Sequence, residues 1–349
     1  MKKLKMGVVG CGFISPAHIN AYKENENTEL IAICDIDEAW LKCAKEIYDV
    51  PYMYTDFLEM YENKELDGVS VCLPTYLHAP AAIPALEKGI HVLCEKPMTT
   101  DAETAKTMIA AERKGGARLM ISQNQRFDRG VQTLKNLHDE GAFGDVYQVR
   151  IGWRRPFGMY PNPYENRPNG MPYSHNWFNE ISKGGGVLRD LGSHLIDLTM
   201  YILGFPKFEG AYANSYRKFI PPIPDPENYV FDSEDLSAGY FKLEGGIGVQ
   251  YEVSLGSPVT AQDMYTRIYG TKLGAHRNIF DLVTLVKPAA DGGFTTEENI
   301  HYKAEPPKHP SFSFIDSILN DKPVPIPSEQ SLRVIEIIDA LYTSSGEIK

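Results

Sequence analysis

Two ionisable side chains lie one helical turn apart in a stretch that is rich in apolar residues. The stretch GGGVLRDLGSHLIDL covers residues 184–198, and we expect a helix after its three glycines. Asp190 and His194 are four residues apart, so a helix places them on one face, and Asp197 and Tyr201 continue the row. A polar row on an apolar helix must face water, a partner or a site, because burying unpaired polar groups is costly.

A histidine beside a carboxylate could perform general acid–base chemistry near neutral pH. The structural alternative is that His194 is a hydrogen-bonded core histidine, the commoner reading of an isolated histidine on an apolar helix. The pairing with Asp190, and a lysine expected in the same crevice, favour the catalytic reading.

That lysine is Lys96, which follows the predicted strand HVLCEK and lies between Glu95 and Pro97. A lysine at this position is either a solvated surface charge or a catalytic group. Its two neighbours predict that Lys96 is held in a fixed geometry. The preceding predicted strand ends in LPTYLHA, whose histidine could also be only a helix-terminus residue. The carboxyl ends of parallel strands open a ligand crevice. The residues expected beside this crevice are Pro74, Thr75, His78, Glu95 and Lys96.

A glycine-rich turn near the N-terminus has the pattern of a dinucleotide-binding loop. The sequence KMGVVG is expected to be a strand, and GCGFIS then opens a helix. The turn matches G-x-G-x-x-G except at the last position, where Ser15 replaces glycine. Gly10 allows the tight turn, and Gly12 lets the backbone approach a pyrophosphate at the helix N-terminus. The alternative is a tight turn with no ligand. The residues expected at the cofactor are Gly10, Gly12, Phe13 and Ile14.

Asp35 ends the second predicted strand, where a carboxylate would accept hydrogen bonds from an adenosine ribose. Its alternative role is the N-cap of the next helix, which Asp37 could fill instead. No arginine follows in CDIDE, so a 2′-phosphate would meet carboxylates and no cation. The sequence therefore predicts NAD rather than NADP.

The order of the predicted elements changes near residue 126. Before it, short apolar strands alternate with amphipathic helices, which predicts a doubly wound parallel sheet covered on both faces. After it, consecutive strands joined by short turns predict a largely antiparallel sheet. These later strands are expected at 210–218, 235–243, 247–255, 264–270 and 281–287. We expect an α/β protein with a dinucleotide-binding domain at 1–125 and a second α/β domain at 126–349.

The composition narrows the class of protein. The 349 residues are too many for one ordinary core, and the 43% hydrophobic and 23% charged content is typical of globular domains. The net charge of −11 argues against a nucleic-acid surface or an anionic membrane surface. The start of the chain has no signal-peptide pattern, and no apolar run is long enough to cross a bilayer.

The cysteines predict a reducing environment. There are five, an odd number, and none forms a C-x-x-C pair. We expect buried reduced thiols in a cytoplasmic protein. The nine histidines are scattered without persuasive ligand spacing, so no metal site is expected.

Together these segments resemble the Gfo/Idh/MocA family, the glucose–fructose oxidoreductase and inositol dehydrogenase group. The resemblance covers essentially the whole chain, and EKP combined with GGG…D…H is much more specific than the glycine motif. It implies an N-terminal Rossmann domain and a C-terminal α/β domain with a large, mainly antiparallel sheet often used in oligomer contacts. The matching segments are GCGFIS, the carboxylate at Asp35, LPTYLHA, CEKP, NQRF at 124–127, GGGVLRDLGSHLIDL and YGTKLG at 269–274.

The resemblance also implies an activity, the NAD-dependent oxidation or reduction of a secondary alcohol on a sugar or cyclitol. Lys96, Asp190 and His194 fall on the family's catalytic positions. His194 is the expected base, while Lys96 would stabilise developing negative charge or itself be the base, and Asp190 would orient Lys96 or a sugar hydroxyl. The family positions that line the nicotinamide side fall on Thr75, Glu95 and Asn124. A homo-oligomer, a dimer or tetramer, is implied as well.

The segment at 153–180 carries many aromatic and polar groups just before the catalytic helix. Such groups suit a carbohydrate, although a lid packed on its own side chains would look similar. The expected substrate contacts are Lys96, Arg155, His175, Asp190 and His194. The length of the segment favours a glycoside, and by analogy with relatives the product would be a 3-keto sugar. Alternatives are a redox-neutral NAD-dependent glycosidase, a sugar-sensing regulator, and a reductase of a non-sugar ligand such as a tetrapyrrole.

Overall fold

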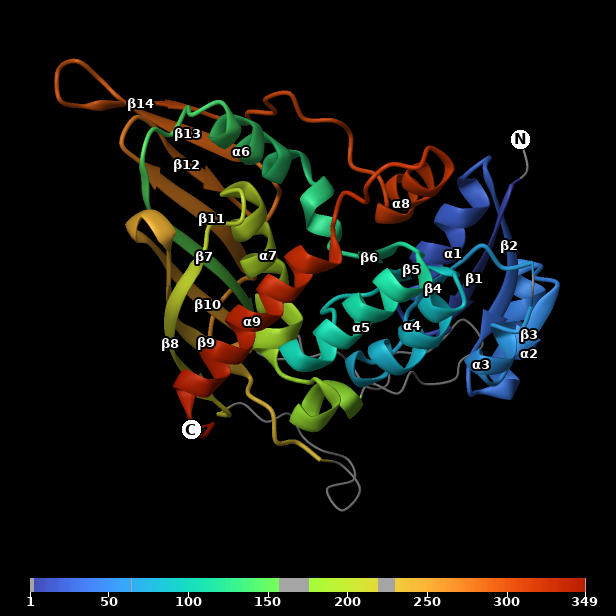
Figure 1. Ribbon diagram of the computed structural model, residues 1–349. Helices are drawn as coiled ribbons and strands as arrows, with labels where there is room; N and C mark the ends of the chain where they lie inside the picture. Colours follow the sequence, from blue (N-terminus) through green and yellow to red (C-terminus); the bar gives the residue numbers. More distant parts are fainter. Residues whose placement is uncertain (1–2, 64, 157–175, 219–229, 349) are drawn as a thin grey trace.

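The computed structural model describes residues 3–63, 65–156, 176–218 and 230–348, which form two sheets with their covering helices (Figure 1). The first sheet is parallel throughout, with strand order β3-β2-β1-β4-β5-β6. Its strands are β1 Leu4–Val9, β2 Thr28–Cys34, β3 Tyr52–Tyr54, β4 Gly68–Val71, β5 His91–Cys94 and β6 Leu119–Ile121. Helices cover both faces, so the central strands are almost wholly buried. The predicted doubly wound sheet is confirmed.

The helices of this part follow the strands in alternation. They are α1 Ser15–Glu24, α2 Glu38–Tyr48, α3 Phe57–Met60, α4 His78–Glu87 and α5 Ala102–Gly115. A further helix, α8 Pro310–Leu319, comes from the end of the chain and contacts α1. Its Phe314 and Ile315 join the core cluster that contains Met6, Val8 and Trp40. The C-terminal segment therefore also serves the first sheet, and the division at residue 125 stays a prediction.

The second sheet is mainly antiparallel, with strand order β14-β13-β12-β11-β7-β10-β9-β8 and one parallel pair, β7 with β10. Its strands are β7 Val146–Pro156, β8 Phe208–Tyr216, β9 Leu236–Leu243, β10 Ile247–Ser257, β11 Asp263–Gly270, β12 Gly274–Arg277, β13 Val283–Pro288 and β14 Phe294–Glu297. The predicted antiparallel sheet is confirmed, whereas the short strands β12 and β14 were not predicted.

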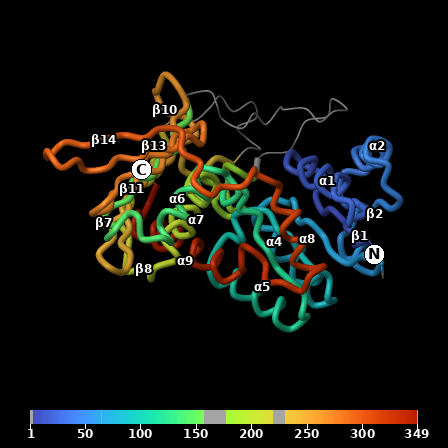
Figure 2. The backbone as a smooth tube through the Cα atoms, turned by 90° about the horizontal axis from the view of Figure 1, so that it is seen from above, coloured from blue at the N-terminus to red at the C-terminus, as the bar shows by residue number. Residues whose placement is uncertain are grey.

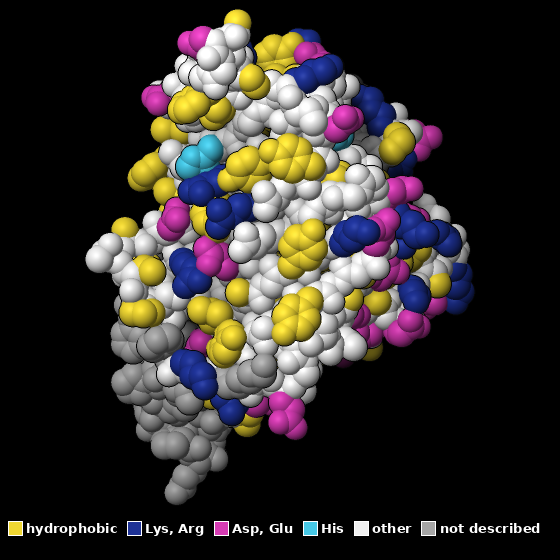
Figure 3. All heavy atoms as spheres, turned by 90° about the vertical axis from the view of Figure 1, so that its left-hand side faces the viewer, with side chains coloured by type: hydrophobic (Ala, Val, Ile, Leu, Met, Phe, Trp, Pro, Cys, Tyr) yellow, Lys and Arg dark blue, Asp and Glu magenta, His cyan; other side chains and the backbone are white. Residues whose placement is uncertain are grey.

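One face of this sheet is covered and the other is open. The helices α6 Arg129–Asp139, α7 Ser193–Ile202 and α9 Ser328–Ser345 pack on the covered face. The opposite face is seen in Figure 3, where aromatic and charged side chains are interspersed. Seen from above, the two sheets lie side by side along the long axis of the molecule (Figure 2). In the described part of the chain, none of the helices is both long and apolar enough to span a bilayer.

The polar row on the helix after the three glycines divides into two halves. Asp197 is buried and pairs with Arg126, whose Nε and Nη2 donate to its two carboxylate oxygens at 2.8 and 2.6 Å. The Arg126 guanidinium also lies 5.0 Å from the centre of the Tyr201 ring, and its Nη1 donates to Gln330 of α9 at 2.5 Å. A buried carboxylate needs an opposite charge, and Arg126 supplies it. Asp197 therefore forms an internal ion pair that joins NQRF to α7, with Tyr201 packed beside it, and neither residue belongs to the site.

Breaking this pair should destabilise the fold strongly. Asp197→Asn leaves the buried Arg126 without its counter-charge, and we expect a loss of about 3–5 kcal/mol in the free energy of unfolding. Urea unfolding followed by tryptophan fluorescence measures it. Glu297→Gln, which removes one partner of the exposed Lys287–Glu297 pair, is the control and should cost less than about 1 kcal/mol. Equal losses in the two variants would contradict a bracing role for Arg126.

Candidate active site

Lys96 and Asp190 form an ion pair that joins the two sheets. The Lys96 Nζ atom donates to Asp190 Oδ1 at 2.7 Å and to the Asp190 backbone oxygen at 3.1 Å. The two side chains are only 16% and 14% exposed, so the pair is largely shielded from water. Lys96 comes from the loop after β5, and Asp190 from the turn before α7. The structure thus brings together two of the three predicted catalytic residues in direct contact.

The three glycines before this turn are required by close contacts. Gly184 has φ +83°, and a Cβ atom there would lie 2.7 Å from Cβ of Thr75. A Cβ on Gly185 would meet the carbonyl oxygen of Phe178, and one on Gly186 (φ +107°) would lie 2.5 Å from Oε2 of Glu234. The chain can therefore pass between these neighbouring groups only without side chains.

Asp190 lies on a π-helical turn, Leu188–Gly192, that leads into α7. π-helical turns are rare in proteins overall, but those that occur are frequently found at functional sites. The turn is anchored by the fully buried Glu234, which accepts hydrogen bonds from the Leu188 backbone N–H at 2.9 Å and from the Tyr342 hydroxyl at 2.7 Å. The anchor and the glycines together set where Asp190 meets Lys96.

His194 is held in its neutral form next to this ion pair. Burial, followed by the positive charge of Lys96, lowers the pKa of His194 to about 3. Its Nδ1 atom is buried and has no hydrogen-bond partner among the described residues. Although burial alone would raise the pKa of Asp190, the charge and hydrogen bond of Lys96 hold it below its usual value. An uncharged imidazole therefore stands beside an ionised pair.

Strand β7 contributes the side chains at the next edge of the site. Alternate residues of a strand point to the same face. Val149 and Ile151 are buried on the covered face, so Trp153 and Arg155 continue toward the site. The Trp153 ring lies 6.0 Å from that of His194, and the Arg155 guanidinium lies 5.2 Å from the Trp153 ring. Of the predicted substrate contacts, His175 lies outside the described residues.

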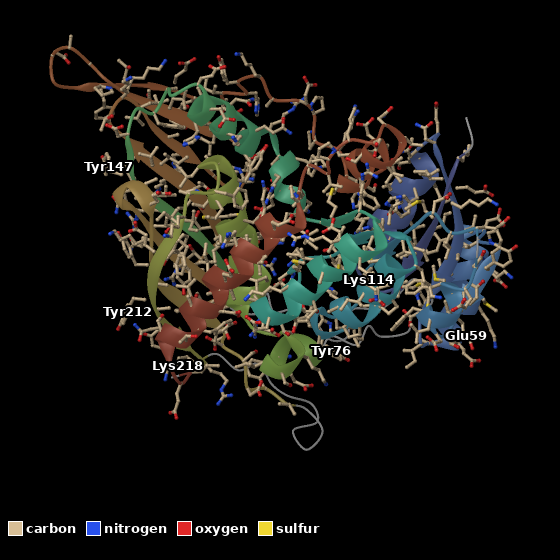
Figure 4. All side chains as sticks on the ribbon, in the orientation of Figure 1. Glu59, Tyr76, Lys114, Tyr147, Tyr212 and Lys218 are labelled. Atoms are coloured by element: carbon tan, nitrogen blue, oxygen red, sulfur yellow. The ribbon has the colours of Figure 1, made fainter. Side chains whose placement is uncertain are left out.

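The residues predicted to line the nicotinamide side of the crevice follow β4, β5 and β6. Thr75 is buried against Gly184, Pro74 precedes it, and Asn124 is exposed after β6. Tyr76, labelled in Figure 4, lies beside the short helical segment at 176–183. The buried His78 places its ring nitrogens 2.9 Å from the Pro97 oxygen and 2.8 Å from the Leu73 oxygen. His78 thus braces the Lys96 loop, and its contact with the cofactor stays a prediction.

The glycine turn fits a dinucleotide. A Cβ atom on Gly10 (φ +87°) would lie 2.5 Å from the Cys72 oxygen, whereas the space around Gly12 is open. Phe13 and Ile14 are 61% and 38% exposed beside it. The Asp35 carboxylate accepts from the Cys11 and Asp37 backbone N–H groups at 2.8 and 3.0 Å. The helix N-cap is Asp37, which accepts from Trp40 N at 2.9 Å, so Asp35 is not needed as a cap.

Other groups close to the site were missed or take different roles. His18 and Glu234 are buried polar residues that the sequence did not single out, because their partners are distant in the chain. None of the five cysteines is in a disulfide; four are buried as expected, whereas Cys43 on α2 is half-buried. Within the described ranges, no cluster of three or more histidine, cysteine or carboxylate side chains is arranged to hold a metal ion.

Comparisons with known proteins identify the family and the fold of this chain. Residues 4–123 match "Oxidoreductase family, NAD-binding Rossmann fold", and residues 131–276 match "GFO/IDH/MocA C-terminal domain". D-glucoside 3-dehydrogenase of Escherichia coli (strain K12) is 28% identical over an alignment 360 residues long, which covers 98% of this chain and 95% of that protein. D-apiose dehydrogenase of Paraburkholderia graminis is 27% identical over 58% of this chain, and this match spans about half, 51%, of that protein.

Solved structures share the fold. Levoglucosan dehydrogenase in complex with NADH has a TM-score of 0.84 at 21% identity, covering 99% of this chain and 97% of that one. The parallel sheet, the glycine turn and the matched families define an NAD-binding oxidoreductase. The chain belongs to the Gfo/Idh/MocA family, as its motifs predicted.

The close approach of the glycines predicts a selective effect of adding one methyl group. Gly184→Ala places a β-carbon against Thr75, whereas Gly245→Ala has the same sign of φ (+79°) but no atom within 4 Å. Positive φ costs each variant about 1–2 kcal/mol. We expect Gly184→Ala to lose clearly more unfolding free energy in urea. Similar losses in both variants would show that the contact with Thr75 is not required.

Proposed function

We propose that the protein oxidises, reversibly, a secondary ring hydroxyl of a sugar, glycoside or cyclitol with NAD as hydride acceptor. The observation that carries this proposal is the Lys96–Asp190 pair beside a neutral His194, at the carboxyl ends of the parallel strands. The fold and the family support the cofactor. The names of similar proteins, such as D-glucoside 3-dehydrogenase and myo-inositol 2-dehydrogenase, support the substrate class.

Each of the three catalytic candidates has a separate role in the proposed reaction. His194 is the proposed acceptor of the hydroxyl proton, because it has a buried ring nitrogen with no partner among the described residues. Its lowered pKa makes it a weaker base than a free histidine, so the identity of the proton acceptor needs a direct test. Lys96 donates a hydrogen bond to the same oxygen and stabilises the negative charge that develops there. Asp190 holds Lys96 in place and stays ionised. A bound NAD would supply the hydride acceptor, so that loss of a hydride from the ring carbon and of the hydroxyl proton leaves a ketone on the sugar.

We further propose an intact glycoside as substrate, oxidised to a 3-keto glycoside. Trp153 and Arg155 offer an aromatic face and a cation at the edge of the site, which suits a polyhydroxylated ring. The relative named D-glucoside 3-dehydrogenase aligns over nearly the whole chain. Arg155 and His175 are the proposed contacts outside the catalytic group.

The function is tested by NADH absorbance with purified protein, NAD and a panel of myo-inositol, glucose, apiose, and methyl and aryl glucosides. We expect NADH with the glucosides, and a loss of at least about 100-fold in kcat in Lys96→Met and His194→Leu. Lys287→Met, at an exposed position near the end of β13, is the control and should retain wild-type kcat. Aryl release without NADH would instead identify a redox-neutral glycosidase, and NAD binding without turnover of any compound would contradict the proposal.

The pH dependence separates the two candidate bases. Because the pKa of His194 is lowered to about 3, its neutral form persists through pH 5–7. If His194 is the base, kcat/KM for oxidation should not fall between pH 7 and pH 5 through this group, since kcat/KM reports the free enzyme. A profile that keeps rising above pH 7 and flattens in Lys96→Met would instead assign the proton to Lys96.

We also propose that the protein is a homo-oligomer formed through the open face of the second sheet. This face exposes Tyr212, labelled in Figure 4, and Tyr240, and both line a hollow of about 370 Å³. Figure 3 shows the same face with its aromatic and charged side chains. Aromatic side chains are enriched at protein interfaces. Light scattering should give a multiple of 39.1 kDa, and Tyr212→Glu should lower it. A wild-type monomer at micromolar concentration would contradict this interface.

A further inference from the structure

A buried polar cluster lies beneath the crevice and takes no part in the proposed reaction. His18 and Tyr22 lie on the inner side of α1 and are both 0% exposed. The His18 Nδ1 atom is 2.9 Å from Ser70 Oγ, and its Nε2 atom is 2.8 Å from Glu95 Oε1. The Tyr22 hydroxyl lies 2.6 Å from the same Ser70 Oγ. The cluster therefore ends at the residue directly before Lys96.

The chemistry of these groups shows which atoms donate and which accept in the hydrogen bonds of the cluster. An ionised carboxylate can only accept hydrogen bonds, so the His18 Nε2–H group donates a hydrogen bond to Glu95. The Nδ1 atom shares a hydrogen bond with the Ser70 hydroxyl. Ser70 in turn accepts from Tyr22, which keeps its proton because burial raises the pKa of its phenol. Three side chains on α1 and β4 thus combine to hold one carboxylate oxygen, and such linked hydrogen bonds strengthen one another.

The charge of Glu95 depends on this contact. Burial alone would raise the pKa of Glu95, but the hydrogen bond and charge of His18, with the charge of Lys96, lower it to about 2. His309, which precedes α8, packs edge-on against His18 with 4.6 Å between ring centres. The titratable groups that face Glu95 are His18, Cys72, His78, Cys94, Lys96, His194 and His309.

We propose that His18 is a positioning residue for Lys96, because its hydrogen bond fixes the Glu95 side chain as an ionised anchor for the loop. The loop is then held on both sides, by His18 at Glu95 and by His78 at the Pro97 carbonyl. From this fixed backbone, Lys96 reaches Asp190 at 2.7 Å. The effect on turnover rests on the proposed function, whereas the anchoring itself does not.

Three variants separate anchoring from packing. His18→Leu fills the volume but removes both hydrogen bonds. His18→Gln keeps an amide N–H that can donate to Glu95, so it should restore the anchor in part. His301→Leu, at an exposed position near the second sheet, is the matched control and should behave as the wild type. Circular dichroism at each pH shows that the variants compared are folded.

The anchor is measured without any substrate. Carboxyl ¹³C NMR of protein labelled at glutamate, with the Glu95 signal assigned from Glu95→Gln, reports its ionisation. We expect the wild type and His301→Leu to keep Glu95 ionised down to pH 4. We expect His18→Leu to show a titration between pH 4 and pH 7, with His18→Gln in between. A Glu95 signal in His18→Leu that matches the wild type would overturn the proposal.

Kinetics with a substrate of the wild-type enzyme then test the effect on Lys96. A misplaced catalytic group commonly costs about 10- to 100-fold, so His18→Leu should lower kcat by that factor with KM changed less than about threefold. The acid limb of its pH profile should coincide with the Glu95 titration, and His18→Gln should recover part of kcat. A folded His18→Leu with wild-type kcat would overturn the positioning role. If the wild type turns over no sugar, the proposed function fails, and NMR still decides the anchor.

Discussion

The ion pair between Lys96 and Asp190 is the contact on which the proposed site depends. The two residues are 94 positions apart in the chain, and their charged atoms meet at 2.7 Å where water is largely excluded. Removing charges from water is expensive, so such a pair adds little net stability, while the loss of one partner is severe. Its value is therefore positional: it fixes an ammonium group at the edge of the parallel sheet and keeps a carboxylate ionised beside a neutral imidazole.

Several contacts around the pair hold Lys96 and Asp190 in their positions. On one side, His78 holds the Pro97 carbonyl and His18 holds Glu95, so the loop that carries Lys96 is restrained at both ends. On the other side, Glu234 binds the start of the turn that carries Asp190. The Arg126–Asp197 pair lies on α7, which follows this turn, and joins that helix to the segment after β6. The site is thus set by rigid elements, which is what precise positioning of reacting groups requires.

The parts of this arrangement that could be predicted from the sequence are those with a local cause. The glycine turn follows from backbone geometry, and the strands and helices follow from hydrophobic periodicity. The short strands β12 and β14 lack that signal: β12 has only four residues, and β14 is exposed along its whole length, so neighbouring strands define them. The residue types in EKP and GGG…D…H indicated the site through their resemblance to a family.

Contacts between distant residues could not be predicted in this way. His18 is 77 positions from Glu95, and nothing in HINAY distinguishes it from an ordinary helical histidine. From its spacing, Asp197 continues the row of Asp190 and His194. In the structure it is paired with Arg126, which is 71 positions away in the chain, so it does not face the site. The roles of Asp35 and Asp37 were left open by the sequence. Only the cap geometry, in which Asp37 accepts from Trp40 N, separates them.

A double-mutant cycle on Lys96 and Asp190 tests the central claim most directly. It compares kcat/KM for the wild type, Lys96→Met, Asp190→Asn and the double variant with the same glycoside. Groups that act as a unit give strongly non-additive effects. If Asp190 acts through Lys96, the double variant should be within about threefold of Lys96→Met alone. Losses that multiply in the double variant would show that the two residues act independently and would contradict the account.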